Sequence, residues 1–200
     1  MTILLTAFGP FADNPSNPSM DALDRVPSSC SGHTVVKAVL PVSYKGASLE
    51  IGKLIASVRP DVVLMTGLAK GRKGISVERI AINVTDSQSP DNDGIRRGGE
   101  PVDPTGPAAY MATLPVDRLV DVLKGEGILS YASNHAGAYV CNTTMYEALK
   151  IASGYETTPF IAGFIHLPLS DEAKTEGDET WSMPLQTIVK ALSVIIATLD

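Results

Sequence analysis

The segment SYKGASLEIGKLIASVRPDVVLMT, residues 43–66, changes its hydrophobic pattern once, at Arg59-Pro60. Before that point the apolar residues recur at helical spacing, with Leu49, Leu54 and Ile55 near one face. After it, residues 61–66 form a short and nearly continuous apolar run, typical of a strand that is buried on both faces. The segment therefore predicts a helix followed by a buried strand.

The same alternation continues in both directions along the chain. Further strand-like runs lie at residues 2–7, 34–40, 77–84, 128–132 and 160–166. Helical spacing recurs at residues 116–124, through Val116, Leu119, Val120 and Leu123, and at residues 184–199, which open with a proline. Alternating strands and helices predict an α/β fold whose sheet is covered on both faces. Because we find no repeat and no linker, we expect residues 1–200 to form a single domain.

Composition and charge narrow the class of protein. The net charge is −6 and the isoelectric point is near 5.0, so no basic face for nucleic acid or an anionic membrane is expected. The first residues lack the positive region of a signal peptide, and no apolar run reaches the ~18 residues of a membrane span. Cys30 and Cys141 are then expected to stay reduced, and we predict a cytoplasmic protein.

Two segments interrupt the alternation. Residues 86–107 are rich in Pro and Gly and almost free of apolar side chains, and residues 170–182 form an acidic stretch that contains the only Trp. Loops this long in a compact domain are usually functional or disordered. The first segment follows the strand that carries Glu78 and the second follows the strand that carries His166. We therefore give equal weight to loops that cover a functional site and to surface loops without a function.

Cys141 stands in GAYVCNTTMY, residues 137–146, just before what the pattern indicates is a helix. A buried, inert cysteine is one interpretation. The other is a nucleophile, because the N–H groups and dipole at a helix start stabilise a thiolate and lower the thiol pKa.

Glu78 and His166 are the other two candidates. His166 ends the apolar run FIAGFIH, where binding crevices of open α/β sheets form, although a histidine with a purely structural role fits equally well. Glu78 places a carboxylate inside an apolar strand beside Arg79, and strand neighbours point to opposite faces. At least one of this pair must find a partner elsewhere, and a histidine that needs orientation is a candidate.

Motifs for metals and nucleotides are missing from the sequence. It contains no CxxC, HExxH, GxGxxG or Walker pattern, and KGRKG at residues 70–74 is only a short basic turn. GxSxG is missing too, which excludes a serine elbow. We expect no metal and no cofactor.

Three stretches together resemble one known family. GLAKGRKGISVERIAIN (67–83), GAYVCNTTMY (137–146) and GFIHLP (163–168) are similar, in order and spacing, to the signature segments of pyroglutamyl peptidase I, also called pyrrolidone-carboxyl peptidase. LLTAFGPFADNPSNPS (4–19), PDND (90–93) and GPAAY (106–110) extend the resemblance. It covers nearly the whole chain.

The resemblance implies a cysteine peptidase that removes an N-terminal pyroglutamyl residue from peptides through a thioacyl-enzyme. Its catalytic residues would be Cys141 as nucleophile, His166 as base and Glu78 as the orienting acid. It also implies an α/β/α sandwich around a mixed, mostly parallel sheet, and a cytoplasmic homo-oligomer, often a tetramer, without cofactor.

The substrate-binding residues that the resemblance implies are Phe8, Phe11, Asn17, Leu68 and Val140. The pyroglutamyl ring is an uncharged lactam, so its pocket needs apolar walls and a few hydrogen bonds. The chain departs from the commoner bacterial pattern twice, with Leu68 where several members have Gln and Gln88 where Arg is common. Both departures concern ring recognition and oxyanion support.

Two other classes of protein stay open. A noncatalytic homologue would bind a peptide end or a small lactam, and the presence of all three triad residue types argues against it. A nucleoside-phosphorylase-like enzyme would share the sandwich architecture, but fold is weak evidence of function and the sequence lacks a phosphate cradle.

Overall fold

The computed structural model describes residues 1–11, 16–154 and 160–199. The helices are α1 (Pro18–Arg25), α2 (Tyr44–Val58), α3 (Val116–Gly125), α4 (Val140–Ser153) and α5 (Leu185–Ala197), with a 3-10 turn at Asp171–Ala173. The strands are β1 (Thr2–Phe8), β2 (Ser29–Cys30), β3 (His33–Leu40), β4 (Val62–Leu68), β5 (Ile75–Glu78), β6 (Ile80–Ile82), β7 (Thr85–Ser87), β8 (Arg97–Glu100), β9 (Ala109–Met111), β10 (Ser130–Ser133), β11 (Ile161–Leu167), β12 (Leu169–Ser170) and β13 (Ser182–Met183).

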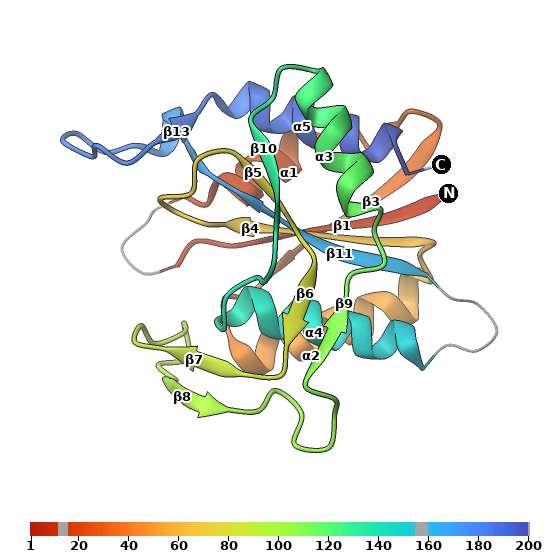
Figure 1. Ribbon diagram of the computed structural model, residues 1–200, viewed down its shortest axis with the longest axis vertical. Helices are drawn as coiled ribbons and strands as arrows, with labels where there is room; N and C mark the ends of the chain where they lie inside the picture. The colour runs from red at the N-terminus through yellow and green to blue at the C-terminus, as the bar shows by residue number, and fades with distance from the viewer. Residues whose placement is uncertain (12–15, 155–159, 200) are drawn as a thin grey trace.

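A seven-stranded sheet forms the middle layer, in the order β10-β5-β11-β4-β1-β3-β2. Its pairs are parallel except β11–β5 and β2–β3, which are antiparallel. Figure 1 shows α1, α3 and α5 on one face of this sheet and α2 and α4 on the other. Each face holds its own cluster of buried apolar side chains. The predicted α/β/α sandwich around a mixed, mostly parallel sheet is confirmed.

The segment at residues 43–66 folds as its pattern predicts. Ser43 caps α2 by accepting a hydrogen bond from the Gly46 N–H at 2.9 Å. The helix ends at Val58, because the C-cap residue Arg59 has a left-handed backbone (φ 50°) and the next residue is a proline, which cannot continue a helix. β4 then runs through the middle of the sheet with Val62 to Gly67 all buried.

Leu49 corrects the predicted face of α2. It is 54% exposed, whereas Ala47, Ile51 and Ile55 are buried at the i, i+4, i+8 spacing of one helix face. The other predicted helix face is confirmed, since Val116, Leu119, Val120 and Leu123 are all buried in α3.

The predicted strand at residues 77–84 is wrong in its continuity. It is two strands, β5 and β6, separated at Arg79. The Arg79 N–H donates to the Ser133 carbonyl at 2.8 Å and its carbonyl accepts from the Ala112 N–H at 2.7 Å. The chain thus leaves the main sheet here and pairs with β9 outside it. Residues 86–107 contain a second small antiparallel pair, β7–β8, that projects from the α2 and α4 side (Figure 1).

The close approach of β11 to the segment before α3 gives a stability prediction. A Cβ on Gly163 would lie 2.5 Å from Leu114 Cδ1 and 2.8 Å from its Cγ. We expect Gly163→Ala to destabilise the fold by about 1–3 kcal/mol, because the buried Leu114 must leave its packed position. Gly125→Ala is the matched control, since its Cβ would meet nothing within 4 Å. Urea unfolding of both variants measures the difference, and equal midpoints would contradict the packing argument.

Candidate active site

Glu78 and His166 meet on one face of the sheet. In the antiparallel β11–β5 pair, His166 lies opposite Ser76, so Glu78, two residues further along β5, points to the same side. Glu78 is fully buried and His166 is 4% exposed. The His166 Nδ1 and the Glu78 Oε1 are 2.7 Å apart, the distance of a strong hydrogen bond. This contact therefore engages Nδ1 of the ring and not Nε2.

Cys141 approaches the sheet beside these two residues. It is the second residue of α4, within the first turn rather than just before it. A Cβ on Gly67 would lie 3.0 Å from the Cys141 Sγ, and Gly67 is the register partner of His166 in the β4–β11 pair. A glycine at this point of β4 thus lets the thiol come down onto the sheet next to the histidine.

The electrostatics of the thiol contradict one expectation. Burial raises the pKa of Cys141 to about 12, and the negative charge of Glu78 acts in the same direction. The Arg72 charge and the Cys141 backbone N–H oppose this rise but do not cancel it. The prediction that the helix start lowers the thiol pKa is therefore wrong, because desolvation outweighs the helix N-terminus.

The pKa values of His166 and Glu78 are both lowered, which leaves His166 neutral and Glu78 ionised. Burial lowers the pKa of His166, although the hydrogen bond and charge of Glu78 raise it in part. Burial alone would raise the pKa of Glu78, but the His166 hydrogen bond and charge, the Ser133 hydroxyl and the Arg72 charge together hold it below its usual value. At neutral pH the site thus holds an ionised Glu78 beside a neutral His166 and a neutral thiol.

Phe8 and Phe11 contact aromatic side chains that lie close to His166 and Cys141 in the fold. The Phe8 ring stacks on Phe164 at a centroid distance of 6.4 Å, and Phe164 in turn lies 4.7 Å from the His166 ring. Phe11 contacts Tyr139, the N-cap residue of α4, at 6.1 Å. Phe8 is thus linked to His166 through Phe164, and Phe11 is linked to the start of α4 through Tyr139.

The other three predicted substrate-binding residues lie differently. The Asn17 amide caps α1 by accepting from the Ser19 N–H at 3.1 Å and donates to the Gly9 carbonyl at 3.0 Å. Its side chain thus connects Gly9 to the start of α1. Val140 is buried beside Cys141, and Leu68 is half-buried at the end of β4. Gln88, the other departure, is exposed.

Arg72 and Asn142 are site residues that the sequence reasoning missed. Arg72 lies in the basic turn before β5, and its Nη1 donates to Glu78 Oε1 and, at 2.8 Å, to Ser76 Oγ. The Asn142 amide pairs with the Ile82 N–H at 2.9 Å and the Ile82 carbonyl at 2.8 Å, which locks the start of α4 to β6. The only available signal was proximity, since Asn142 follows Cys141 and Arg72 precedes Glu78 by six residues.

The long loop reaches the site through its PDND turn, residues 90–93. Asp91 accepts hydrogen bonds from the backbone N–H groups of Tyr44, Asp93 and Ile95 at 2.8–3.0 Å. The Tyr139 hydroxyl donates to the Pro90 carbonyl at 2.9 Å. The turn therefore joins the start of α2 to the start of α4. In the acidic loop, Asp178 forms an ion pair with Lys70 at 2.9 Å, beside the turn that carries Arg72.

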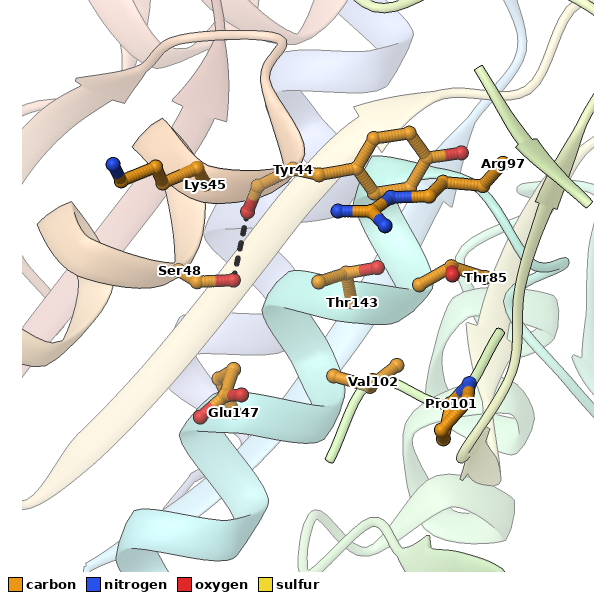
Figure 2. Close-up of a pocket in the computed structure, with 9 residues that line it drawn as sticks. All are labelled: Tyr44, Lys45, Ser48, Thr85, Arg97, Pro101, Val102, Thr143 and Glu147. Atoms are coloured by element: carbon orange, nitrogen blue, oxygen red, sulfur yellow. Dashed lines mark hydrogen bonds between the residues drawn. The ribbon is translucent and has the colours of Figure 1, made fainter. Parts of the chain in front are cut away.

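A separate pocket of about 230 Å³ lies between α2, α4 and the β7–β8 hairpin (Figure 2). Thr143 and Glu147 line it from α4, and at about 3.6 residues per turn they point roughly 200° and 240° around the helix from Cys141. The Arg97 guanidinium lies 5.7 Å over the Tyr44 ring at its rim. None of the predicted site residues lines this pocket, so it is distinct from the candidate active site.

No group of three or more His, Cys, Asp or Glu side chains with metal-binding geometry occurs in the described part of the chain. Within the same residues, no helix has both the length and the apolar character to cross a membrane.

A thiol at a helix start, a buried histidine and a buried carboxylate on an α/β sandwich are the parts of a cysteine-type hydrolase. A family model described as pyroglutamyl peptidase matches residues 1–200. The chain belongs to this family, which supports the removal of N-terminal pyroglutamate by a cysteine peptidase.

Relatives and solved structures agree with this assignment. The chain is 44% identical to a pyrrolidone-carboxylate peptidase of Thermococcus onnurineus, over 99% of this chain and 98% of the relative. It is similar to a mutant pyrrolidone carboxyl peptidase from Pyrococcus furiosus, with a TM-score of 0.94, 34% identity and coverage of 100% and 98%. Pyroglutamyl peptidase I of Bacillus amyloliquefaciens matches with a TM-score of 0.93, 33% identity and coverage of 99% and 96%.

The buried Glu78–His166 pair predicts a specific pH response. Glu78→Gln removes the negative charge that raises the pKa of His166, so the acid limb of kcat/KM should move to lower pH by about one unit. The acid limb is the one that moves, because the thiol and the imidazole are neutral in the resting site and the base must be unprotonated. Activity on the plateau should fall at least about tenfold, since an amide can hold the wrong tautomer. A pH–rate profile of the folded variant tests this, and an unmoved, fully active profile would make Glu78 merely structural.

Proposed function

We propose that this chain hydrolyses the bond after an N-terminal pyroglutamyl residue through a Cys141–His166–Glu78 triad and a thioacyl-enzyme. The observation that supports it most is the 2.7 Å contact between the buried His166 and Glu78 side chains, beside a thiol that a Cβ on residue 67 would approach to 3.0 Å. A structural histidine needs no such neighbour. The proposal goes beyond family membership by assigning each role to a residue.

The first half of the reaction forms the thioacyl-enzyme. The His166 Nε2 removes the Cys141 proton while Sγ attacks the pyroglutamyl carbonyl carbon, so deprotonation and attack proceed together from the neutral pair. The carbonyl oxygen becomes an oxyanion, which unpaired backbone N–H groups in the first turn of α4 can stabilise. The C–N bond then breaks, and the His166 imidazolium gives its proton to the leaving amine.

The second half returns the enzyme to its resting state. A water molecule loses a proton to His166 Nε2 and attacks the thioester carbonyl. The C–S bond breaks, pyroglutamate leaves, and the proton on His166 restores the Cys141 thiol. Throughout both halves the Glu78 carboxylate holds Nδ1–H and balances the transient imidazolium charge.

Recognition of the ring follows from the uncharged walls of the site. Phe8 is linked to His166 through Phe164, and Phe11 is linked to the start of α4 through Tyr139, which supports a pocket that these two rings help to form. A lactam has no ammonium group, so it can enter such a pocket without burying an unpaired charge. We assign Phe8, Phe11 and Val140 to contact with the ring, Leu68 to the pocket edge, and Asn17 to support of the loop behind Phe11.

The remaining features of this proposal depend on the resemblance. We infer that residues 1–200 act as one catalytic domain, in the cytoplasm, as a homo-oligomer and in particular a tetramer. Exposed apolar side chains on several elements, among them Val39, Leu49 and Met111, are compatible with subunit contacts. The single catalytic domain, the cytoplasmic location and the oligomeric state stay predictions.

The assignment of the nucleophile is tested with a pyroglutamyl-coupled fluorogenic amide. We expect Cys141→Ala to lower kcat by about 10³-fold or more, because no other side chain replaces the attacking thiolate. Cys30→Ala is the matched control and should keep wild-type activity, since Cys30 lies at the other end of the sheet order in β2. Full activity of folded Cys141→Ala would refute the triad, and a wild type that binds but never cleaves would favour the noncatalytic alternative.

Specificity provides an independent test of the pocket. A prolyl amide has the shape of the pyroglutamyl amide but carries a charged ring nitrogen and lacks the lactam carbonyl. We expect its kcat/KM to be at least about 100-fold lower, because the ammonium would lose its hydration against Phe8 and Phe11. The same assay with N-terminal Gln and Glu substrates should give equally low values. Comparable values for prolyl and pyroglutamyl amides would show that neutrality does not select the substrate.

A further inference from the structure

Arg72 is mostly buried and bonds buried polar side chains, unlike a typical surface arginine. It lies in the turn between β4 and β5, and its side chain is 26% exposed. Nη1 donates to Glu78 Oε1 and Ser76 Oγ, and a weaker contact of 3.4 Å reaches Ser133 Oγ. Nη2 lies 3.5 Å from the His135 carbonyl oxygen. The guanidinium thus spans the end of β5 and the end of β10.

The contact with Glu78 is important because this carboxylate has few other hydrogen-bond and ion-pair partners in the described part of the chain. The same oxygen, Oε1, accepts both from Arg72 and from His166, while the buried Oε2 has no hydrogen-bond partner within the described residues. Ion pairs join Glu78 only to Arg72 and His166 in that part of the chain. Since His166 rests neutral, Arg72 supplies the one full positive charge that contacts this buried carboxylate. A buried carboxylate without such a partner takes up a proton instead.

We propose that Arg72 is a positioning residue: it holds Glu78 ionised and oriented toward His166 Nδ1, and its charge keeps the Glu78–His166 pair from taking up a proton. This inference rests on the proposed role of His166 as the base. Arg72 does not touch the reacting atoms in this arrangement. It acts through Glu78, and its effect appears in the protonation and the orientation of the imidazole.

The direction of the charge effect follows from the contacts. A positive charge lowers the pKa of a neighbouring histidine and of a neighbouring carboxyl group, and Arg72 acts in this sense on His166 and on Glu78. The two groups share a hydrogen bond, so proton uptake belongs to the pair. Removal of Arg72 must therefore raise the pH at which the pair is protonated. This shift is opposite to that expected for Glu78→Gln.

The other charged groups around the pair are already engaged. Cys141 faces it from α4 as a neutral thiol. Lys70, on the same turn as Arg72, is paired with Asp178 of the acidic loop. Arg79 follows Glu78 but points to the opposite side, where it pairs with Asp117 of α3. The His135 ring accepts from the Gly137 N–H at 3.1 Å, so only its backbone carbonyl meets Arg72.

The test compares Arg72→Met, Arg72→Lys and the control Arg79→Met. Arg79→Met removes an equal charge one residue from Glu78 on the other face of the strand. For Arg72→Met we expect kcat to fall about tenfold or more with little change in KM, and the acid limb to rise by roughly 0.5–1 pH unit. Arg72→Lys keeps the charge but loses the planar fork, so kcat should fall while the acid limb stays in place. Arg79→Met should match the wild type.

A second measurement needs no substrate turnover. NMR titration of 13C-labelled histidine follows the His166 ring directly, with His166→Gln used to assign its signal among the three histidines. The midpoint should rise in Arg72→Met and stay put in Arg72→Lys and Arg79→Met. An unmoved midpoint in Arg72→Met, or an equal rise in Arg79→Met, overturns the proposal. If Arg72→Met does not fold, a midpoint in Arg72→Lys that departs from the wild type overturns it, and an unchanged midpoint with reduced kcat supports it.

Failure of the proposed function gives a different pattern. An active Cys141→Ala variant would remove the triad while leaving the histidine titration free to show the Arg72 effect. If the wild type has no peptidase activity, the NMR titration of His166 still decides whether Arg72 acts on the Glu78–His166 pair. Conversely, normal pyroglutamyl hydrolysis by Arg72→Met with an unmoved His166 midpoint refutes only the role of Arg72.

Discussion

The carboxylate of Glu78 is the constraint on which the site depends. It is fully buried at the end of β5, and an ionised group in that position costs several kcal/mol unless it is paired and hydrogen-bonded. His166 and Arg72 converge on it from β11 and from the preceding turn, and both bond the same oxygen. The antiparallel β11–β5 pair, next to the β10 edge of an otherwise mostly parallel sheet, creates this convergence, because it sets residue 78 diagonally across from residue 166.

A second constraint is the approach of α4 to that pair. Glycine at position 67 leaves room for the thiol against the sheet, and Asn142 holds the first turn of α4 on β6. Tyr139 fixes the same turn from outside by bonding the PDND segment. Loop 86–107, which has almost no apolar residues, is thus ordered by backbone-directed hydrogen bonds instead of by core packing. Its composition alone could not distinguish this from disorder.

The sequence predicts the layers of the fold and points to the three residues of the proposed triad, but it does not predict the contacts that support them. Apolar periodicity indicates burial. It therefore predicts the strands around residues 61–66 and 160–166, and it makes the carboxylate of Glu78 conspicuous among its apolar neighbours. The break at Arg79 was not, because it depends on backbone bonds to Ser133 and Ala112 from distant segments. Arg72 looked like a plain basic turn, since only the folded chain brings it to Glu78. The thiol pKa was predicted with the wrong sign, because burial of Cys141 exceeds the pull of the helix start.

The neutral thiol and imidazole have a consequence for the proposed substrate. Arg72 and Glu78 cancel each other's charge, so the site as a whole is close to neutral before substrate arrives. A charged N-terminal amine in the pocket proposed between Phe8 and Phe11 would find no counterion, whereas the lactam ring introduces no charge to balance. Charge then appears only as His166 takes the thiol proton and the oxyanion forms, next to a carboxylate and a helix start already oriented to receive it. Such a site separates charge in the transition state and not in the resting enzyme. Stabilisation that exists only in the transition state is the kind that raises kcat.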